Sequence, residues 1–203
     1  MQAFSLIVLL FSVIIHEISH GYAALAQGDR TAEYEGRLTL NPLKHIDPIG
    51  TVLLPLLSYW SGGFLFGWAK PVPFNPYNLR NQRWGEALVA VAGPASNLIV
   101  ALVFGLFIRL YLAPHGIAVG PAGTICAVIV LVNLTLAVFN LVPIPPLDGS
   151  KILSAVLPQG WMRVRAAIER FGFLGVVVFL LFVWRFLAPV VPWLFGTITG
   201  MSL

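Results

Sequence analysis

Long runs of apolar residues limit this chain more than any other feature of its sequence. A helix needs about 20 apolar residues to cross the hydrocarbon core of a membrane. Four runs are long enough: Ala3–Ala26, Ala87–Leu112, Gly123–Leu141 and Phe171–Leu194. Charged residues make up only 10% of the chain, whereas a typical soluble domain carries about 25%. The composition therefore argues against a disordered chain, a disulfide scaffold or a free nucleic-acid binder, and indicates an integral membrane protein.

A fifth apolar stretch, Ile49–Phe66, is interrupted by Pro55 and by the pair Gly62–Gly63. It fits a re-entrant hairpin, two half-helices or one short span. We therefore expect an all-α polytopic membrane protein with about four transmembrane helices plus a hydrophobic hairpin or extra short spans, forming a single domain over residues 1–203. The first run has neither a basic region before it nor a small-residue cleavage site after it, so we expect a retained helix and not a signal peptide.

The basic residues predict which way the spans run. Ten of the twelve Lys and Arg lie in three connections, after the first run, after the fifth stretch and after the third run: Arg30, Arg37, Lys44, Lys70, Arg80, Arg83, Lys151, Arg163, Arg165 and Arg170. Basic loops stay in the cytosol, so we expect a multi-pass protein of the cell membrane with its N-terminus outside. This orientation requires Ile49–Phe66 to enter and leave the membrane on the same side.

The connection after the first run has two features of its own. The segment Thr31–Leu40 has a weak strand alternation around Gly36, which predicts a short β-hairpin at the membrane edge. Further on, His45 and Asp47 could serve as an additional metal ligand or a gate. A plain turn, in which the Asp47 carboxylate hydrogen-bonds the backbone, is the reading we favour.

The residues that suggest chemistry are His16-Glu17-Ile18-Ser19-His20, in the first run. Residues four apart lie on one face of a helix, so both imidazoles can reach a single ion. Two histidines suit zinc, which lowers the pKa of water, and Glu17 would act as the general base. Cobalt or iron would fit the same ligands. A polar cluster satisfied by neighbouring helices is the plainer alternative, but buried ionisable residues in a membrane span usually carry a function.

A catalytic zinc needs a third protein ligand and one open position. Most acids lie in loops or at the start of a span: Asp29, Glu33, Glu35, Asp47, Glu86 and Glu169. Asp148 differs, because it follows the third run directly, after prolines that break the helix at membrane depth. Gly149 permits a sharp turn just beyond it. The alternative is that Asp148 caps a helix over Ser150–Val156.

These residues resemble the site-2 protease family of intramembrane zinc metalloproteases. The resemblance is carried by His16-Glu17-x-x-His20 and by Asn140-x-x-Pro-x-Pro-x-Leu-Asp148-Gly149, with support from three stretches that have no assigned chemistry: Gly36–Pro48, Gly67–Pro73 and Ala92–Asn97. It implies a zinc ion bound by His16, His20 and Asp148, with Glu17 as the general base. The orientation predicted from the basic residues places this site toward the cytosolic side of the membrane.

The resemblance also implies a role for Asn140 near the scissile bond, where its amide would stabilise the oxyanion or hold the substrate backbone. An interhelical hydrogen bond is an equal alternative. Ser96, Asn97 and Gly93 suggest helix packing, without a catalytic role. The long members of the family carry PDZ domains, and we expect none here.

The implied activity is hydrolysis of a peptide bond within or next to a transmembrane helix of a membrane-protein substrate. The expected partners are that substrate and the lipid bilayer, and no nucleic acid. Three alternatives remain open: a membrane metallopeptidase that cuts exposed loops, a non-proteolytic zinc-binding protein or transporter, and a catalytically dead assembly factor. Glu17 favours an enzyme, since metal transport does not need a base beside the histidines.

Overall fold

Three long helices form the main body of the protein in the computed structural model, which describes residues 2–53, 69–157 and 182–202. They are α1 (Gln2–Ala26), α4 (Gly85–Phe107), which continues as the π-helical turn η4 (Ile108–Leu112), and α5 (Pro121–Asn140). All three are long and apolar enough to cross a membrane. They match the first three predicted runs to within two residues at each end, because a lipid environment leaves the backbone few options besides the helix.

The remaining described elements are short. They are α2 (Thr31–Tyr34), η1 (Pro42–Lys44), η2 (Pro48–Leu53), η3 (Pro76–Asn78), α6 (Asp148–Val156), α9 (Trp184–Leu187) and α10 (Val190–Thr199). The fifth apolar stretch thus begins in the π-helical η2, and its residues 54–66 lie outside the described part of the chain.

The expected β-hairpin is wrong for the part of the chain that the structure describes, in which every regular element is a helix and there is no strand. Thr31–Tyr34 forms one helical turn, because the Asp29 carboxylate accepts from the Thr31 backbone N–H at 3.2 Å and from its hydroxyl at 2.6 Å. Gly36 then turns the chain with φ +60°, and the Arg37 N–H bonds back to the Ala32 carbonyl. A few alternating residues between such turn signals do not need a strand partner.

The fourth predicted run is described only from residue 182 onward. There it is divided between α9 and α10, which are separated by a turn at Ala188–Pro189. Proline has no N–H to continue the helical ladder, so the described end of this run is not a single continuous helix. Its residues 171–181 lie outside the described ranges.

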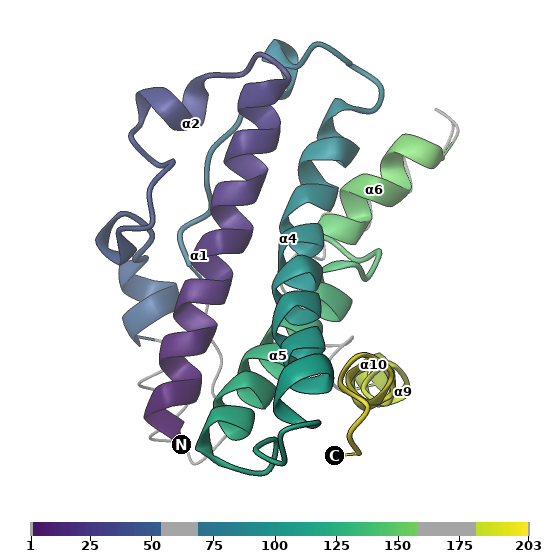
Figure 1. Ribbon diagram of the computed structural model, residues 1–203. Coiled ribbons are helices and arrows are strands. Elements are labelled where there is room, and N and C mark those ends of the chain that lie inside the picture. The colour runs from purple at the N-terminus through teal and green to yellow at the C-terminus, as the bar shows by residue number, and fades with distance from the viewer. Residues whose placement is uncertain (1, 54–68, 158–181, 203) are drawn as a thin grey trace.

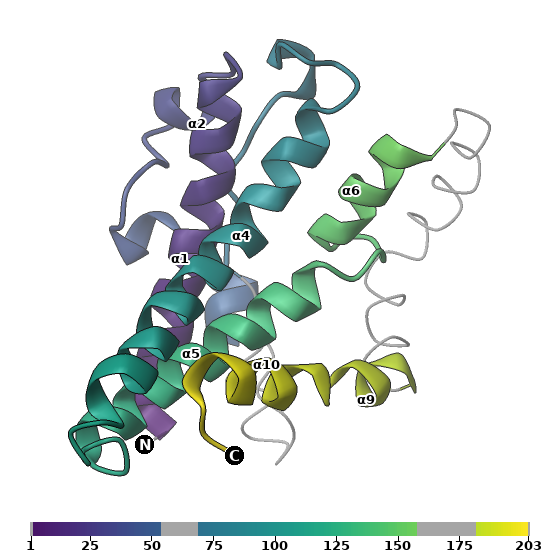
Figure 2. The same cartoon turned by 45° about the vertical axis from the view of Figure 1, so that its right-hand side comes forward.

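Helix α4 lies at the centre and contacts α1, α5, α6 and α10 (Figure 1). Figure 2 shows α9 and α10 lying across the long helices. A hydrophobic core fills the junction of α4, η4, α5 and α10, and includes Ala101, Ile108, Val130, Leu134 and Phe195. The second half of α1 contacts α4 and, through His16 and His20, the start of α6, where the candidate site lies.

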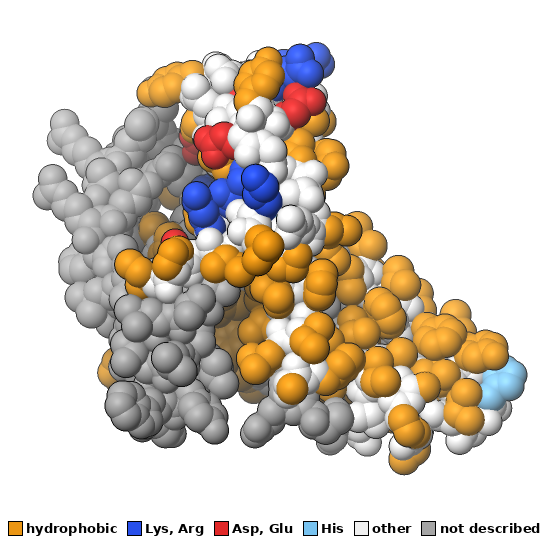
Figure 3. All heavy atoms as spheres, turned by 90° about the vertical axis from the view of Figure 1, so that its left-hand side faces the viewer, with side chains coloured by type: hydrophobic (Ala, Val, Ile, Leu, Met, Phe, Trp, Pro, Cys, Tyr) orange, Lys and Arg blue, Asp and Glu red, His pale blue; other side chains and the backbone are white. Residues whose placement is uncertain are grey.

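One face of the molecule divides into a charged end and an apolar body. On the face in Figure 3, Lys, Arg, Asp and Glu side chains gather in the upper part, and hydrophobic side chains cover the part below. Large apolar side chains on the long helices are exposed, among them Ile7, Leu88, Ile99 and Val103. A water-facing surface rarely carries so continuous an apolar band. Together with the three apolar helices, it supports a multi-pass membrane protein.

Candidate metal centre

Helix α1 presents His16 and His20 on one face, as their spacing predicts. Both residues are buried, and their ring centroids lie 4.7 Å apart with the ring planes nearly perpendicular. His20 lies six residues before the end of α1, which places it about 9 Å inside the helix end, and His16 lies one turn deeper. Two imidazoles are therefore held side by side within an apolar span.

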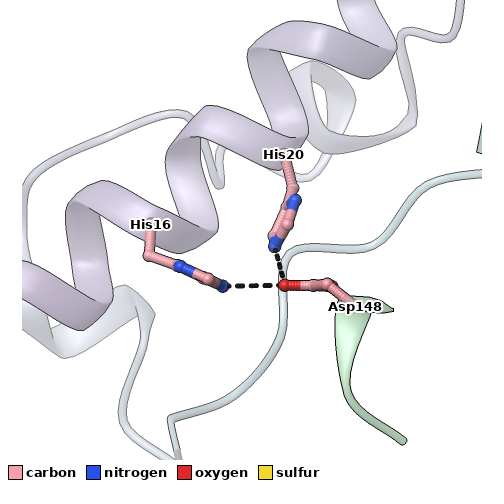
Figure 4. Close-up of side chains that lie close together, drawn as sticks. All are labelled: His16, His20 and Asp148. Carbon is pink, nitrogen blue, oxygen red and sulfur yellow. Dashed lines mark hydrogen bonds and ion pairs between the residues drawn. The ribbon is translucent and has the colours of Figure 1, made fainter. Parts of the chain in front are cut away.

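Asp148 comes to both histidines from the start of α6. Its Oδ2 atom lies 3.1 Å from His16 Nε2 and 3.2 Å from His20 Nε2 (Figure 4). The alternative capping role is not seen, since Leu147 occupies the N-cap position of α6 and no side-chain cap bond is made. Two histidines of α1 and one distant aspartate thus direct one ligand atom each to a common point.

The geometry and the chemistry of these donors fit a zinc ion. The three ligand atoms lie within 4.8 Å of one another, and all three residues are buried. Donor atoms around a tetrahedral zinc lie about 3.3 Å apart, close to the N···O separations of this cluster. Two neutral imidazoles and a carboxylate also form a common catalytic zinc set, with a fourth position left for water or substrate.

The other candidate acids in the described residues are engaged elsewhere or lie outside this group. Asp29 bonds Thr31, Asn75 and Asn78, while Glu33 pairs with Arg30 on the surface. Glu35 and Glu86 also lie outside the metal-ligand group, and Glu169 lies outside the described ranges.

The predicted bonding of the Asp47 carboxylate to nearby backbone is confirmed, and it occurs where η2 begins. Its Oδ1 accepts from the backbone N–H groups of Ile49 and Gly50 at 3.0 and 2.6 Å. The buried His45 ring bonds the Thr39 carbonyl through Nε2 at 2.8 Å, and neither residue joins the metal-ligand group. The additional ligand that we considered at these two positions is therefore not present in the described structure.

The proline-rich segment before α6 places Asp148. The backbone of Leu141 and Val142 passes so close to Gly149 that a Cβ there would lie 2.2 Å and 2.4 Å from their carbonyl oxygens. Gly149 is thus needed for close backbone approach; it lies inside α6 and does not form the sharp turn that we expected. On the other side of the carboxylate, Lys151 Nζ lies 3.8 Å from Asp148 Oδ1.

Helix α4 contributes three residues, spaced four apart, that contact the two histidines. The Val89 carbonyl lies 2.7 Å from His20 Nδ1, and Asn97 Oδ1 lies 2.6 Å from His16 Nδ1. Between them, a Cβ on Gly93 would lie 2.5–2.6 Å from the Nε2 atoms of both rings, so only glycine leaves them room. Sequence reasoning assigned Gly93 and Asn97 to packing and missed this contact. An asparagine in the middle of an apolar span was the available signal.

Glu17 and Asn140 make separate contacts. Glu17 is half-buried, and its Oε2 accepts from the Val72 backbone N–H at 2.8 Å. Asn140, the last residue of α5, donates to the Leu136 carbonyl of its own helix at 3.0 Å. This bond is intrahelical, so the interhelical bond that we considered is not the one observed, and the role near the scissile bond stays a prediction.

Comparison with known proteins agrees with the geometry. The model of peptidase family M50 matches residues 4–118 and 115–183. YwhC of Bacillus subtilis, named as a provisionally assigned zinc metalloprotease, is 37% identical over 90% of this chain and 81% of its own length. Rip2 of Mycolicibacterium smegmatis, named in the same way, is 36% identical over 85% of this chain and 64% of its own length. No solved structure matches. The chain belongs to peptidase family M50, which confirms the resemblance to the site-2 proteases.

Proposed function

We propose that this protein is a zinc metalloendopeptidase that hydrolyses a peptide bond within or next to a transmembrane helix of a membrane-protein substrate. The observation that carries the proposal is the convergence of His16 Nε2, His20 Nε2 and Asp148 Oδ2 inside a bundle of apolar helices. Family membership and the names of the relatives support a zinc peptidase. The location of the ligands inside a span supports a substrate that is itself in the membrane.

In the proposed mechanism, His16, His20 and Asp148 hold the metal and Glu17 moves the proton. Zinc bound there would polarise the scissile carbonyl and make water a better nucleophile at neutral pH. Glu17 takes the proton from the attacking water and returns it to the leaving amine. The hydrogen bond from the Val72 N–H to Oε2 holds this carboxylate in place for the transfer.

The substrate has to unwind before it can react, because a helix hides its carbonyls in its own hydrogen bonds. Water reaches the ligands most simply from the charged end of the molecule, about 9 Å from His20 along α1. Asn140 is the side chain we propose to hold the unwound substrate backbone, through an amide that would exchange its present bond to Leu136.

Purified protein in detergent, incubated with a model membrane substrate, tests the proposal. We expect Glu17→Gln to keep its zinc and to cleave at least about 100-fold more slowly, since general acid–base catalysis contributes roughly 10²–10⁴-fold. Asp148→Asn should lower zinc content, because a neutral amide is a weaker ligand than a carboxylate. Glu33→Gln, at an exposed acid paired with Arg30, is the matched control and should cleave like the native protein.

One result would replace the proposal with its alternative. If Glu17→Gln cleaves as fast as the native protein, the hydrolase mechanism is wrong. A zinc-binding protein or transporter that needs no base would then be the better account.

A further inference from the structure

A chain of buried polar side chains runs from His16 into the apolar interior. Asn97 Nδ2 donates to Asn133 Oδ1 at 2.9 Å and to the Ser12 carbonyl at 3.3 Å. Asn133 Nδ2 in turn donates to the Ser12 hydroxyl and to the Ile129 carbonyl, both at 2.9 Å. Asn97 and Asn133 are fully buried and Ser12 is 5% exposed. Burying two amides in a membrane span is costly unless each of their groups is satisfied.

The backbone carbonyls that these side chains contact fix the donor and the acceptor of each hydrogen bond in the series. The carbonyls of Ile129 and Ser12 can only accept, so each amide must direct its NH₂ group toward them. Asn97 therefore directs Oδ1 toward His16, 2.6 Å from Nδ1. An amide oxygen cannot donate, so His16 Nδ1 must carry the hydrogen. The neutral His16 ring then has its lone pair on Nε2, the atom that faces Asp148.

His20 reaches the same state by a different contact. Its Nδ1 lies 2.7 Å from the Val89 carbonyl, which also can only accept. Its Nε2 lone pair is thus directed at Asp148 as well. Because Val89 and Asn97 lie eight residues apart, one face of α4 sets which nitrogen carries the hydrogen in each neutral ring.

We propose that Asn97 is a positioning residue that keeps His16 in the metal-binding tautomer and orientation, and that Asn133 and Ser12 orient Asn97. The proposal rests on the proposed metal role of His16. A ligand histidine whose second nitrogen has no acceptor is free to rotate and to move its hydrogen to the metal-binding nitrogen. Loss of such a partner typically weakens metal binding by about 10–100-fold.

The test compares two substitutions at one position, by zinc affinity measured with a competing chelator on the full chain in detergent. Asn97→Asp keeps an acceptor for His16 Nδ1 but buries a charge. Asn97→Leu keeps the branching of the side chain at Cγ and removes the acceptor. A positioning role predicts that Asn97→Leu binds zinc about 10–100-fold more weakly than the native protein. The loss of zinc affinity in Asn97→Asp should be smaller. A packing role predicts the reverse order, since leucine suits an apolar interior better than a carboxylate.

Controls separate this proposal from the proposed function. Thr199→Val removes a hydroxyl that is equally buried in α10, where it donates to Phe195, and should leave zinc affinity unchanged. If the native protein does not bind zinc, the metal site itself is wrong. If native protein binds zinc and Asn97→Leu binds it equally well, only the role of Asn97 is wrong. Should Asn97→Leu fail to fold, Asn133→Leu decides: weaker zinc binding supports the role, and unchanged binding overturns it.

Discussion

At the scale of single residues, the contact between Glu17 and Val72 makes the sharpest prediction. Val72 lies between two prolines, so its N–H is the only one that Pro71–Pro73 can offer to the Glu17 carboxylate. Val72→Pro deletes this hydrogen and releases the base. A hydrogen bond to a charged group contributes about 1.5–3 kcal/mol. We expect kcat to fall by at least about 10-fold, which corresponds to roughly 1.4 kcal/mol, while zinc content stays native.

Val72→Ala is the matched control for this experiment. It removes most of the buried side chain, which packs near Gly21, but keeps the N–H. A much smaller loss of kcat should follow. Equal losses in the two variants would mean that the side chain matters and the amide does not, and the prediction would then be wrong.

The residues of the candidate site differ in how far the sequence could predict them. The spacing of His16 and His20 fixes their common face through helix geometry alone, so that part needed no tertiary information. Asp148 required an inference across the chain, from a broken helix at membrane depth. Asn97 could not be assigned in this way, because an asparagine that packs helices and one that orients a ligand look the same until the facing residue is known.

At the scale of elements, Asp29 joins the end of α1 to the chain that leads into α4. This 1% exposed carboxylate accepts from Thr31, from the Asn75 N–H at 2.7 Å and from the Asn78 amide at 2.9 Å. Burial alone would raise the pKa of Asp29, but the hydrogen bonds from Thr31, Asn78 and Asn75 outweigh it and lower the pKa below its ordinary value. The ionised Asp29 carboxylate therefore stabilises the contact between the end of α1 and the segment before α4.

This pKa shift predicts a stability that depends on pH in a defined direction. Since folding lowers the pKa of Asp29, its contribution is present above the unfolded pKa of about 3.9 and is lost as pH falls through the lower folded value. Asp29→Asn should lower the free energy of unfolding by about 1–3 kcal/mol at neutral pH, because the new NH₂ group faces other donors. When the pH is lowered, the variant should lose less of its remaining stability than the native protein does. Thermal unfolding in detergent at several pH values measures both effects.

The exposed pair of Glu33 and Arg30 supplies the control for this acid experiment. Glu33→Gln removes a surface ion pair that water and salt screen, so its unfolding curve should follow the native one across the same pH range. If Asp29→Asn and the native protein lose stability in parallel as pH falls, Asp29 is not the group responsible.

The elements also show why sequence prediction worked better for long segments than for short ones. An apolar run of about 20 residues has one stable form in a bilayer. Thr31–Leu40 has no such constraint, and its weak alternation fitted a strand as well as a helical turn. Tertiary contacts favour the helical turn: Asp29 bonds Thr31, and the buried Arg37 guanidinium donates to the carbonyls of Lys70 and Pro71.

At the scale of the whole molecule, the segments before and after the fifth apolar stretch contact each other, and these contacts concern the membrane topology. The Gln27 carbonyl accepts from the Arg80 N–H at 2.9 Å, and Asp29 accepts from Asn75. The chain before residue 49 and the chain after residue 68 therefore meet at one end of the bundle. This supports the prediction that the fifth stretch enters and leaves on the same side, so that the loops after α1 and before α4 share a compartment.

The orientation of this end can be tested in cells. Cys126 is buried, so its replacement by serine gives a background for single cysteines at two exposed positions, Glu35 after α2 and His115 between η4 and α5. With the basic loops in the cytosol, a membrane-impermeant maleimide should label His115→Cys in intact cells. It should label Glu35→Cys only after permeabilisation, because α4 separates the two positions. The opposite pattern would place the N-terminus in the cytosol and the metal ligands toward the outer face.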